Sequence, residues 1–131
     1  MSLVVPNQGE QLMLQKVLNQ TLTLKLFKNN VTPGETDTEA TYTVADFTGY
    51  ADKSLTYANW GFTPGAPTVA LYNAAQAFTS GADGQSQTIY GYFVIQASDG
   101  KLLWAERFAD APITIVNNND AINVTPRITL E

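Results

Sequence analysis

The sequence contains no cysteine and no histidine among its 131 residues. Together these two residue types supply the thiol nucleophile, the commonest general base and the softer metal ligands. Their absence excludes Ser-His-Asp and Cys-His catalytic sets as well as disulfide bonds. Charged residues are also few, at 15%, whereas hydrophobic residues make up 44%. This balance argues against a disordered chain or a coiled coil and favours one globular domain over residues 1–131.

Basic residues are outnumbered and scattered. Seven of them face twelve acidic residues, which gives a net charge of −5. The seven are Lys16, Lys25, Lys28, Lys53, Lys101, Arg107 and Arg127. Because no cluster could neutralise several phosphates, we expect no nucleic-acid partner, and the acidic balance disfavours anionic membranes.

No long apolar run is present either. The longest stretches, such as residues 102–105, are far too short to span a membrane. Residues 1–6 lack the basic start and long apolar segment of a secretory signal. We therefore expect no membrane association and synthesis in a cytosol.

One helix is expected near the start of the chain. Asn7 is a candidate N-cap, and Glu10 follows three residues later, as in a capping box. Leu14, Val17 and Leu18 then recur at helical spacing. This pattern predicts a short helix over about residues 8–19.

Alternation of period two follows the helix. In residues 21–28, Leu22, Leu24 and Leu26 alternate with polar residues, which predicts a half-buried strand. Asp99-Gly100 is the strongest hairpin signal. Further strands are expected over residues 50–60, 68–78, 87–97, 102–108, 112–116 and 122–130, with a helical turn at 44–47. The chain is therefore predicted to be mainly β, an antiparallel β-sandwich or barrel-like domain on which residues 1–20, an arm and a short helix, pack.

Carboxylates are the main candidates for catalytic or metal-binding residues. Glu35, Asp37 and Glu39 alternate in one loop, while Glu106 and Asp110 flank a strand end. Paired carboxylates serve glycosidases and Ca²⁺ sites. However, the loop lacks the ligand spacing of an EF-hand, and a small β domain rarely forms a deep cleft. We interpret these residues as a solvated loop and predict no enzyme activity, no cofactor and no metal.

Aromatic residues could stack on sugars, although most large rings in a sandwich fill its core. Core burial is favoured for these rings. Trp60, beside Gly61, is the best candidate for an exposed one, with Tyr57 nearby.

The segment before the helix is apolar, with Leu3, Val4 and Val5 ahead of Pro6. One interpretation is a frayed terminus. The other is an arm that docks on a neighbouring chain by adding to a sheet edge, which five residues spanning at most about 18 Å could reach. Leu3, Val4, Val5 and Trp60 are the candidate partner contacts.

Several segments together resemble small proteins of tailed bacteriophages and prophages. They are the opening Val5-Pro6-Asn7, the region from Leu22 to Tyr50, the segment Ile89–Val94, and Trp104-Ala105-Glu106-Arg107-Phe108. The resemblance covers nearly the whole chain but contains no catalytic motif, so it implies a setting and transfers no site residue.

That resemblance implies a virion component made in the bacterial cytoplasm, either a capsid decoration protein or a tail- or fibre-associated module. The first hypothesis is a structural protein that contacts capsid or tail proteins and itself, as a trimer if it sits at a three-fold position. The alternative is a tail- or fibre-associated carbohydrate-binding module that uses Trp60 or Tyr57. A small glycan hydrolase is disfavoured by the composition.

Overall fold

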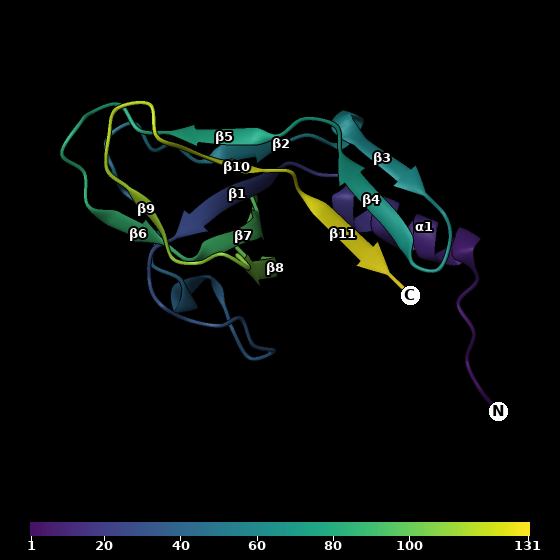
Figure 1. The fold of residues 1–131 in the computed structure, drawn as a ribbon. Coiled ribbons are helices and arrows are strands. Elements are labelled where there is room, and N and C mark those ends of the chain that lie inside the picture. The colour runs from purple at the N-terminus through teal and green to yellow at the C-terminus, as the bar shows by residue number, and fades with distance from the viewer.

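The computed structural model describes residues 1–131 as a mainly β, sandwich-like fold with 37% strand and 14% helix. All strand pairs are antiparallel, and the single α-helix lies near the N-terminus (Figure 1), so the predicted fold class is confirmed. The elements are α1 (Asn7–Leu18), β1 (Leu22–Phe27), β2 (Lys53–Leu55), β3 (Trp60–Thr63), β4 (Thr68–Tyr72), β5 (Gln76–Thr79), β6 (Gln87–Ile89), β7 (Gly91–Gln96), β8 (Leu102–Arg107), β9 (Ile113–Ile115), β10 (Ala121–Val124) and β11 (Arg127–Leu130), with 3₁₀ turns at Glu39–Thr41 and Tyr57–Asn59.

The first layer is a four-stranded sheet in the order β2-β1-β7-β8. Strand β1 lies inside this sheet, and Leu22, Leu24 and Leu26 on one of its faces are fully buried, as their alternation predicted. The predicted hairpin at Asp99-Gly100 joins β7 to β8, with Gly100 at φ +75°. That left-handed conformation is readily adopted by glycine.

Two long antiparallel ribbons contain most of the strands, and one of them includes β7 and β8 of the four-stranded sheet. In the first ribbon, β4 pairs with β11 and β5 pairs with β10. In the second, β6 pairs with β9 and β7 pairs with β8. Each ribbon is interrupted once, so its two halves belong to different sheets. Figure 1 shows the first ribbon bending between β5–β10 and β4–β11.

Four predicted strands are corrected, three of them by these interruptions. Residues 50–60 contain β2, a 3₁₀ turn and the start of β3, whereas 68–78, 87–97 and 122–130 each form two strands. Pro126 lies at one interruption and has no N–H to continue a ladder, although its carbonyl accepts a hydrogen bond from Tyr72 N at 2.9 Å. Three residues, 73–75, stand opposite Thr125 at this bend of the ribbon (Figure 1).

The predicted helical turn at residues 44–47 is also wrong. Val44 instead forms an isolated bridge to Phe27, and the turn lies earlier, at Glu39–Thr41. A capping box between Thr38 and Thr41 fixes its position, with Thr38 N donating to Thr41 Oγ1 at 3.0 Å.

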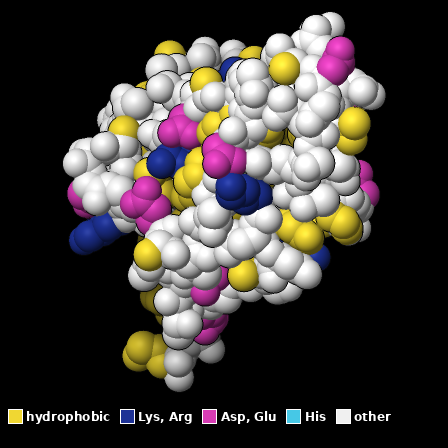
Figure 2. Space-filling view, turned by 90° about the vertical axis from the view of Figure 1, so that its left-hand side faces the viewer, with side chains coloured by type: hydrophobic (Ala, Val, Ile, Leu, Met, Phe, Trp, Pro, Cys, Tyr) yellow, Lys and Arg dark blue, Asp and Glu magenta, His cyan; other side chains and the backbone are white.

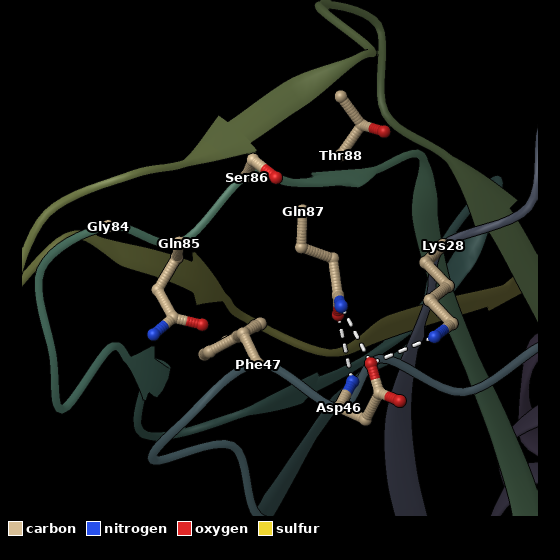
Figure 3. Close-up of a pocket in the computed structure, with 8 residues that line it drawn as sticks. All are labelled: Lys28, Asp46, Phe47, Gly84, Gln85, Ser86, Gln87 and Thr88. Carbon is tan, nitrogen blue, oxygen red and sulfur yellow. Dashed lines mark hydrogen bonds and ion pairs between the residues drawn. The ribbon is translucent and has the colours of Figure 1, made fainter.

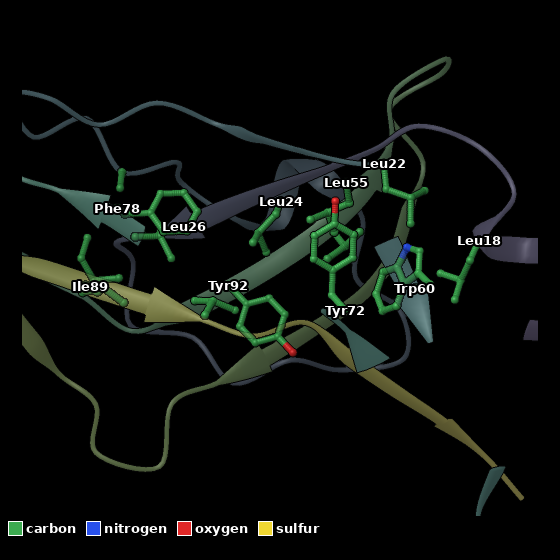
Figure 4. Close-up of a cluster of buried hydrophobic side chains, with 14 of the residues drawn as sticks. Leu18, Leu22, Leu24, Leu26, Leu55, Trp60, Tyr72, Phe78, Ile89 and Tyr92 are labelled. Atoms are coloured by element: carbon green, nitrogen blue, oxygen red, sulfur yellow. The ribbon is translucent and has the colours of Figure 1, made fainter. Parts of the chain in front are cut away.

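A cluster of 18 buried side chains forms the main core and draws on residues from Leu14 to Val124. Figure 4 shows its extent, from Phe78 and Ile89 at one end to Trp60 and Leu18 at the other. A second, smaller cluster contains Phe27, Tyr42, Phe93 and Ile95 and lies under the loop that follows β1. Helix α1 packs against β3 and β4, in the three-stranded sheet β11-β4-β3.

Candidate functional site

The N-terminal arm, residues 1–6, extends away from the folded body (Figure 1). The side chains of Leu3 and Val4 are 91% and 76% exposed. The only backbone hydrogen bond of the arm is the one that Pro6 O accepts from Glu10 N, at 3.0 Å. The arm therefore presents apolar side chains and unpaired backbone groups to the solvent.

The outer face of α1, defined by Leu12, Met13 and Val17, continues this apolar surface. Met13 and Val17 are four residues apart, so they lie on the same side of the helix. Six of the eight exposed large hydrophobic side chains lie in the first 17 residues, and none of the first nine residues is charged. The arm and the outer face of α1 together form the candidate interaction surface.

The opposite face of α1 fixes this surface to the fold. Leu14 and Leu18 are buried in the main core. Glu10 is buried as well, and its carboxylate accepts a hydrogen bond of 2.6 Å from the hydroxyl of Thr68 on β4. Val5 lies over the first turn, because a methyl group on Gly9 would be 3.3 Å from Val5 Cγ1.

The predicted capping of this helix is wrong. Pro6 is the N-cap residue, no side chain caps the helix, and α1 begins at Asn7 and ends at Leu18. Proline suits the helix start because its φ is already near −65° and its missing N–H leaves no donor unpaired. Glu10 consequently faces β4 instead of closing a capping box.

We expect Thr68→Val to loosen the attachment of α1. The substitution keeps the side-chain shape but removes the donor to a buried carboxylate, which costs about 1–3 kcal/mol of the free energy of unfolding. Urea denaturation measures this loss. The matched control is Thr129→Val on β11, an exposed position where the change should stay within about 0.5 kcal/mol. Equal stabilities of the two variants would contradict the structural role of the Glu10–Thr68 hydrogen bond.

Trp60 does not lie on the surface. Its side chain is 6% exposed, and its ring packs edge-on against Tyr72 and Trp104, with centroid distances of 5.1 and 6.2 Å. Figure 4 shows Trp60 between Leu18 and Tyr72. Trp60 as an exposed partner contact is therefore a wrong prediction, because α1 covers this ring; core burial, the favoured interpretation for these aromatics, is correct here.

A shallow hollow beside β6 brings Lys28, Asp46 and Gln87 together (Figure 3). Lys28 Nζ donates to Asp46 Oδ1 at 2.8 Å, and Gln87 Nε2 donates to the same oxygen at 2.6 Å. These hydrogen bonds lower the pKa of Asp46 below its usual value. The carboxylate is thus held ionised by neighbours that tie the loop before Phe47 to β6, which is a structural arrangement.

The acidic loop borders a second hollow, together with residues 99–102, and is held by internal contacts. Asp37 accepts hydrogen bonds from Tyr42 Oη at 2.7 Å and Gly34 N at 2.8 Å, and these lower its pKa. Glu39 instead pairs with Lys25 at 3.6 Å. No three carboxylates gather into a group that could hold a metal ion. The loop therefore consists of separately engaged side chains.

A third hollow lies between the end of β8 and the junction of β10 with β11. Tyr92, Glu106 and Phe108 form one wall, and Val124 and Arg127 belong to the other. Tyr92 Oη donates to Glu106 Oε2 at 3.2 Å. Burial, together with the Glu106 charge, raises the pKa of Tyr92 to about 12.

Charge does not mark the face on the β6–β9 side for an ionic partner. Figure 2 looks at the molecule from the β6–β9 side and shows basic and acidic side chains lying next to one another across the centre of this face. Only three ion pairs form, and all involve Lys25 or Lys28. The candidate interaction surface is therefore distinguished by apolar exposure, at the other end of the molecule.

Comparisons with known proteins identify no family for this chain. No family model matches the sequence, and no curated protein or solved structure matches it. No helix in the structure is long and apolar enough to cross a membrane. The resemblance to bacteriophage proteins therefore stays a prediction, and the geometry of the arm and α1 is the basis for a functional proposal.

Proposed function

We propose that the protein is a non-enzymatic structural component of a phage virion, a capsid decoration or cement protein that binds capsid subunits and copies of itself. The observation that supports this proposal is the exposed apolar arm, which leads into α1 and its exposed apolar outer face. Leu3 and Val4 remain almost fully in water in the isolated chain, which is unfavourable unless a partner covers them.

Burial of the arm against a partner contributes a substantial binding free energy. Burying three aliphatic side chains contributes roughly 1.5–3 kcal/mol each, before the entropy of ordering the arm is subtracted. A single contact of this size is weak. A capsid repeats its subunits, however, so an oligomer that engages several arms at once gains avidity without any new type of contact. In this proposal the oligomer is a trimer, because the resemblance implies a three-fold position.

The carbohydrate-binding alternative has no observation in its favour. It needs an exposed stacking ring, and Trp60 lies in the core. Tyr57 is half-buried, with its ring 6.2 Å from that of Phe62. The tail or fibre location proposed with it therefore rests on the sequence resemblance alone.

Removal of the arm is the test of this function. We expect the full chain to form trimers at tens of micromolar in light scattering and to bind undecorated shells assembled from the major capsid protein of the same virion. A chain that begins at Asn7 should be monomeric and lose shell binding at least tenfold, because it lacks Leu3, Val4 and Val5. Its thermal unfolding should stay cooperative, because the arm makes a single backbone hydrogen bond to the body, and its melting temperature should fall only by the contribution of Pro6 and of trimer formation.

A matched control keeps the arm but removes its apolar character, with Leu3→Ser and Val4→Ser in one variant. This variant should behave like the shortened chain. Shell binding that survives both changes would reject the arm as the contact. Binding that is absent from the full chain would reject the capsid proposal itself.

A further inference from the structure

Strand β8 leaves one edge of the four-stranded sheet open. The opposite side of β8 pairs with β7, where Gln96 N donates to Lys101 O and Phe108 N donates to Tyr90 O, both at 2.9 Å. Because hydrogen bonding alternates along an antiparallel pair, the N–H and C=O groups of Ala105 and Arg107 point away from β7. No other strand of this chain pairs with them.

This edge is suited to receive another strand. β8 has six residues, and its first four, residues 102–105, are apolar. A bulge between Val94 and Ile95 disturbs its beginning, so the regular half runs from Trp104 to Arg107. That half borders the third hollow, whose wall contains Phe108 and Val124. A strand added there would find backbone partners along the edge and a partly apolar recess beside it.

The other free edges are less suitable. β2, β6 and β9 have three residues each, and β3, β5, β10 and β11 have four each, with Pro64 directly after β3 and Pro126 directly before β11. Proline and very short length are common protections of exposed strand edges. β8 is the longest open edge, and Arg107 is the one charged residue whose backbone groups face outward in its regular half.

We propose that the arm of one copy adds as a strand to the open edge of β8 in a second copy, with an aliphatic side chain of the arm in the third hollow. This inference rests on the proposed function, because it gives the arm of that function its acceptor. The arm supplies unpaired backbone groups and the β-branched residues Val4 and Val5, which favour strands.

Charge and geometry favour a second copy as the donor. Two chains of net charge −5 repel each other overall, but the arm has no charged side chain, and the regular half of β8 carries one acidic and one basic residue, Glu106 and Arg107, so the contact itself brings no like charges together. Within one chain, the arm points away from β8 (Figure 1). If each copy places its arm on β8 of the next copy around a ring, the open edge of β8 is occupied in every copy and the oligomer is closed.

Engineered cysteines test the pairing directly, because the natural chain has none. Chains carrying Val4→Cys are mixed under mild oxidation with chains carrying Glu106→Cys, whose side chain is exposed beside the open edge. Residues facing each other on paired strands lie about 4.5–5.5 Å apart, within disulfide range. The matched controls place the acceptor at Thr129→Cys on β11 or Thr63→Cys on β3, which are also exposed.

We expect the disulfide between Val4→Cys and Glu106→Cys to form at least tenfold faster than either control disulfide. Equal rates at all three edges would overturn the assignment to β8. If the arm is required for shell binding but cross-links without this preference, the β8 inference fails and the proposed function remains. If the shortened chain binds shells normally, the proposed function fails, whatever the cross-linking shows.

A pair of proline variants provides a second readout. Ala105→Pro removes an outward N–H from β8, and Thr129→Pro removes one from β11, where pairing of Tyr72 with Pro126 directs Thr129 outward. Each variant is first checked for cooperative thermal unfolding. We expect Ala105→Pro to lose self-association in light scattering and Thr129→Pro to retain it. The reverse pattern would overturn the inference.

Discussion

Gly91→Ala is expected to lower the free energy of unfolding by about 3 kcal/mol or more. Gly91 lies on β7 and is buried, between Phe27 of β1 and Glu106 of β8. An added methyl group would lie 2.6 Å from Cζ of the Phe27 ring and closer still to the carbonyl oxygen of Glu106. Neither atom can yield easily, because one belongs to the backbone and the other to a fully buried ring.

Thermal unfolding should show this loss as a fall in the melting temperature of roughly 10 °C, given about 3–5 °C per kcal/mol for a chain of this size. The matched control is Gly61→Ala on β3, where the nearest atom to an added methyl group is Leu71 O at 3.8 Å. That variant should unfold at the natural temperature or slightly above it, since alanine reduces the entropy of the unfolded chain.

A second substitution separates the two obstacles around Gly91. Adding Phe27→Leu to Gly91→Ala removes the ring but leaves the Glu106 carbonyl. The free energy of unfolding should therefore fall by less than the sum of the two single losses, but the double variant should still be less stable than the natural chain. A Gly91→Ala variant within about 1 kcal/mol of the natural chain would mean that β1, β7 and β8 are more widely spaced than in this structure.

Local patterns in the sequence predicted local structure well. Alternation in residues 21–28 predicted a strand with Leu22, Leu24 and Leu26 inward, and Asp99-Gly100 predicted the β7–β8 hairpin. Both signals arise within a few neighbouring residues. The interruptions of the long strands were missed, although Pro126 inside an apolar run was a visible sign that a ladder could not continue.

Long-range contacts account for the remaining differences. Glu10 resembles a capping residue because of its spacing from Asn7, yet its partner is Thr68, 58 residues away. No local pattern can indicate such a pair. The same holds for the candidate site. The apolar residues Leu3–Val5 can be recognised in the sequence, whereas the outer face of α1 is defined by the packing of Leu14 and Leu18 into the core. Tertiary packing decides which side of a short, mixed helix is buried.

Trp60 shows most clearly how packing overrides local sequence. Gly61, beside it, suggested an exposed ring at a turn, but β3 runs through both residues and α1 lies against the sheet there. We therefore expect Trp60→Ala to lower the free energy of unfolding by about 3–5 kcal/mol, because it empties a buried site next to Tyr72 and Trp104.

Urea denaturation distinguishes this packing role from a surface role. Tyr57→Ala is the control, since Tyr57 is half-buried on the neighbouring turn and should cost clearly less. Trp60→Phe should fall between them: it leaves a smaller gap, and it gives up no hydrogen bond, because the indole N–H of Trp60 has no partner. A Trp60→Ala variant within about 0.5 kcal/mol of the natural chain would be the behaviour of a surface residue. It would return Trp60 to the candidate partner contacts and reopen the case for a stacking surface.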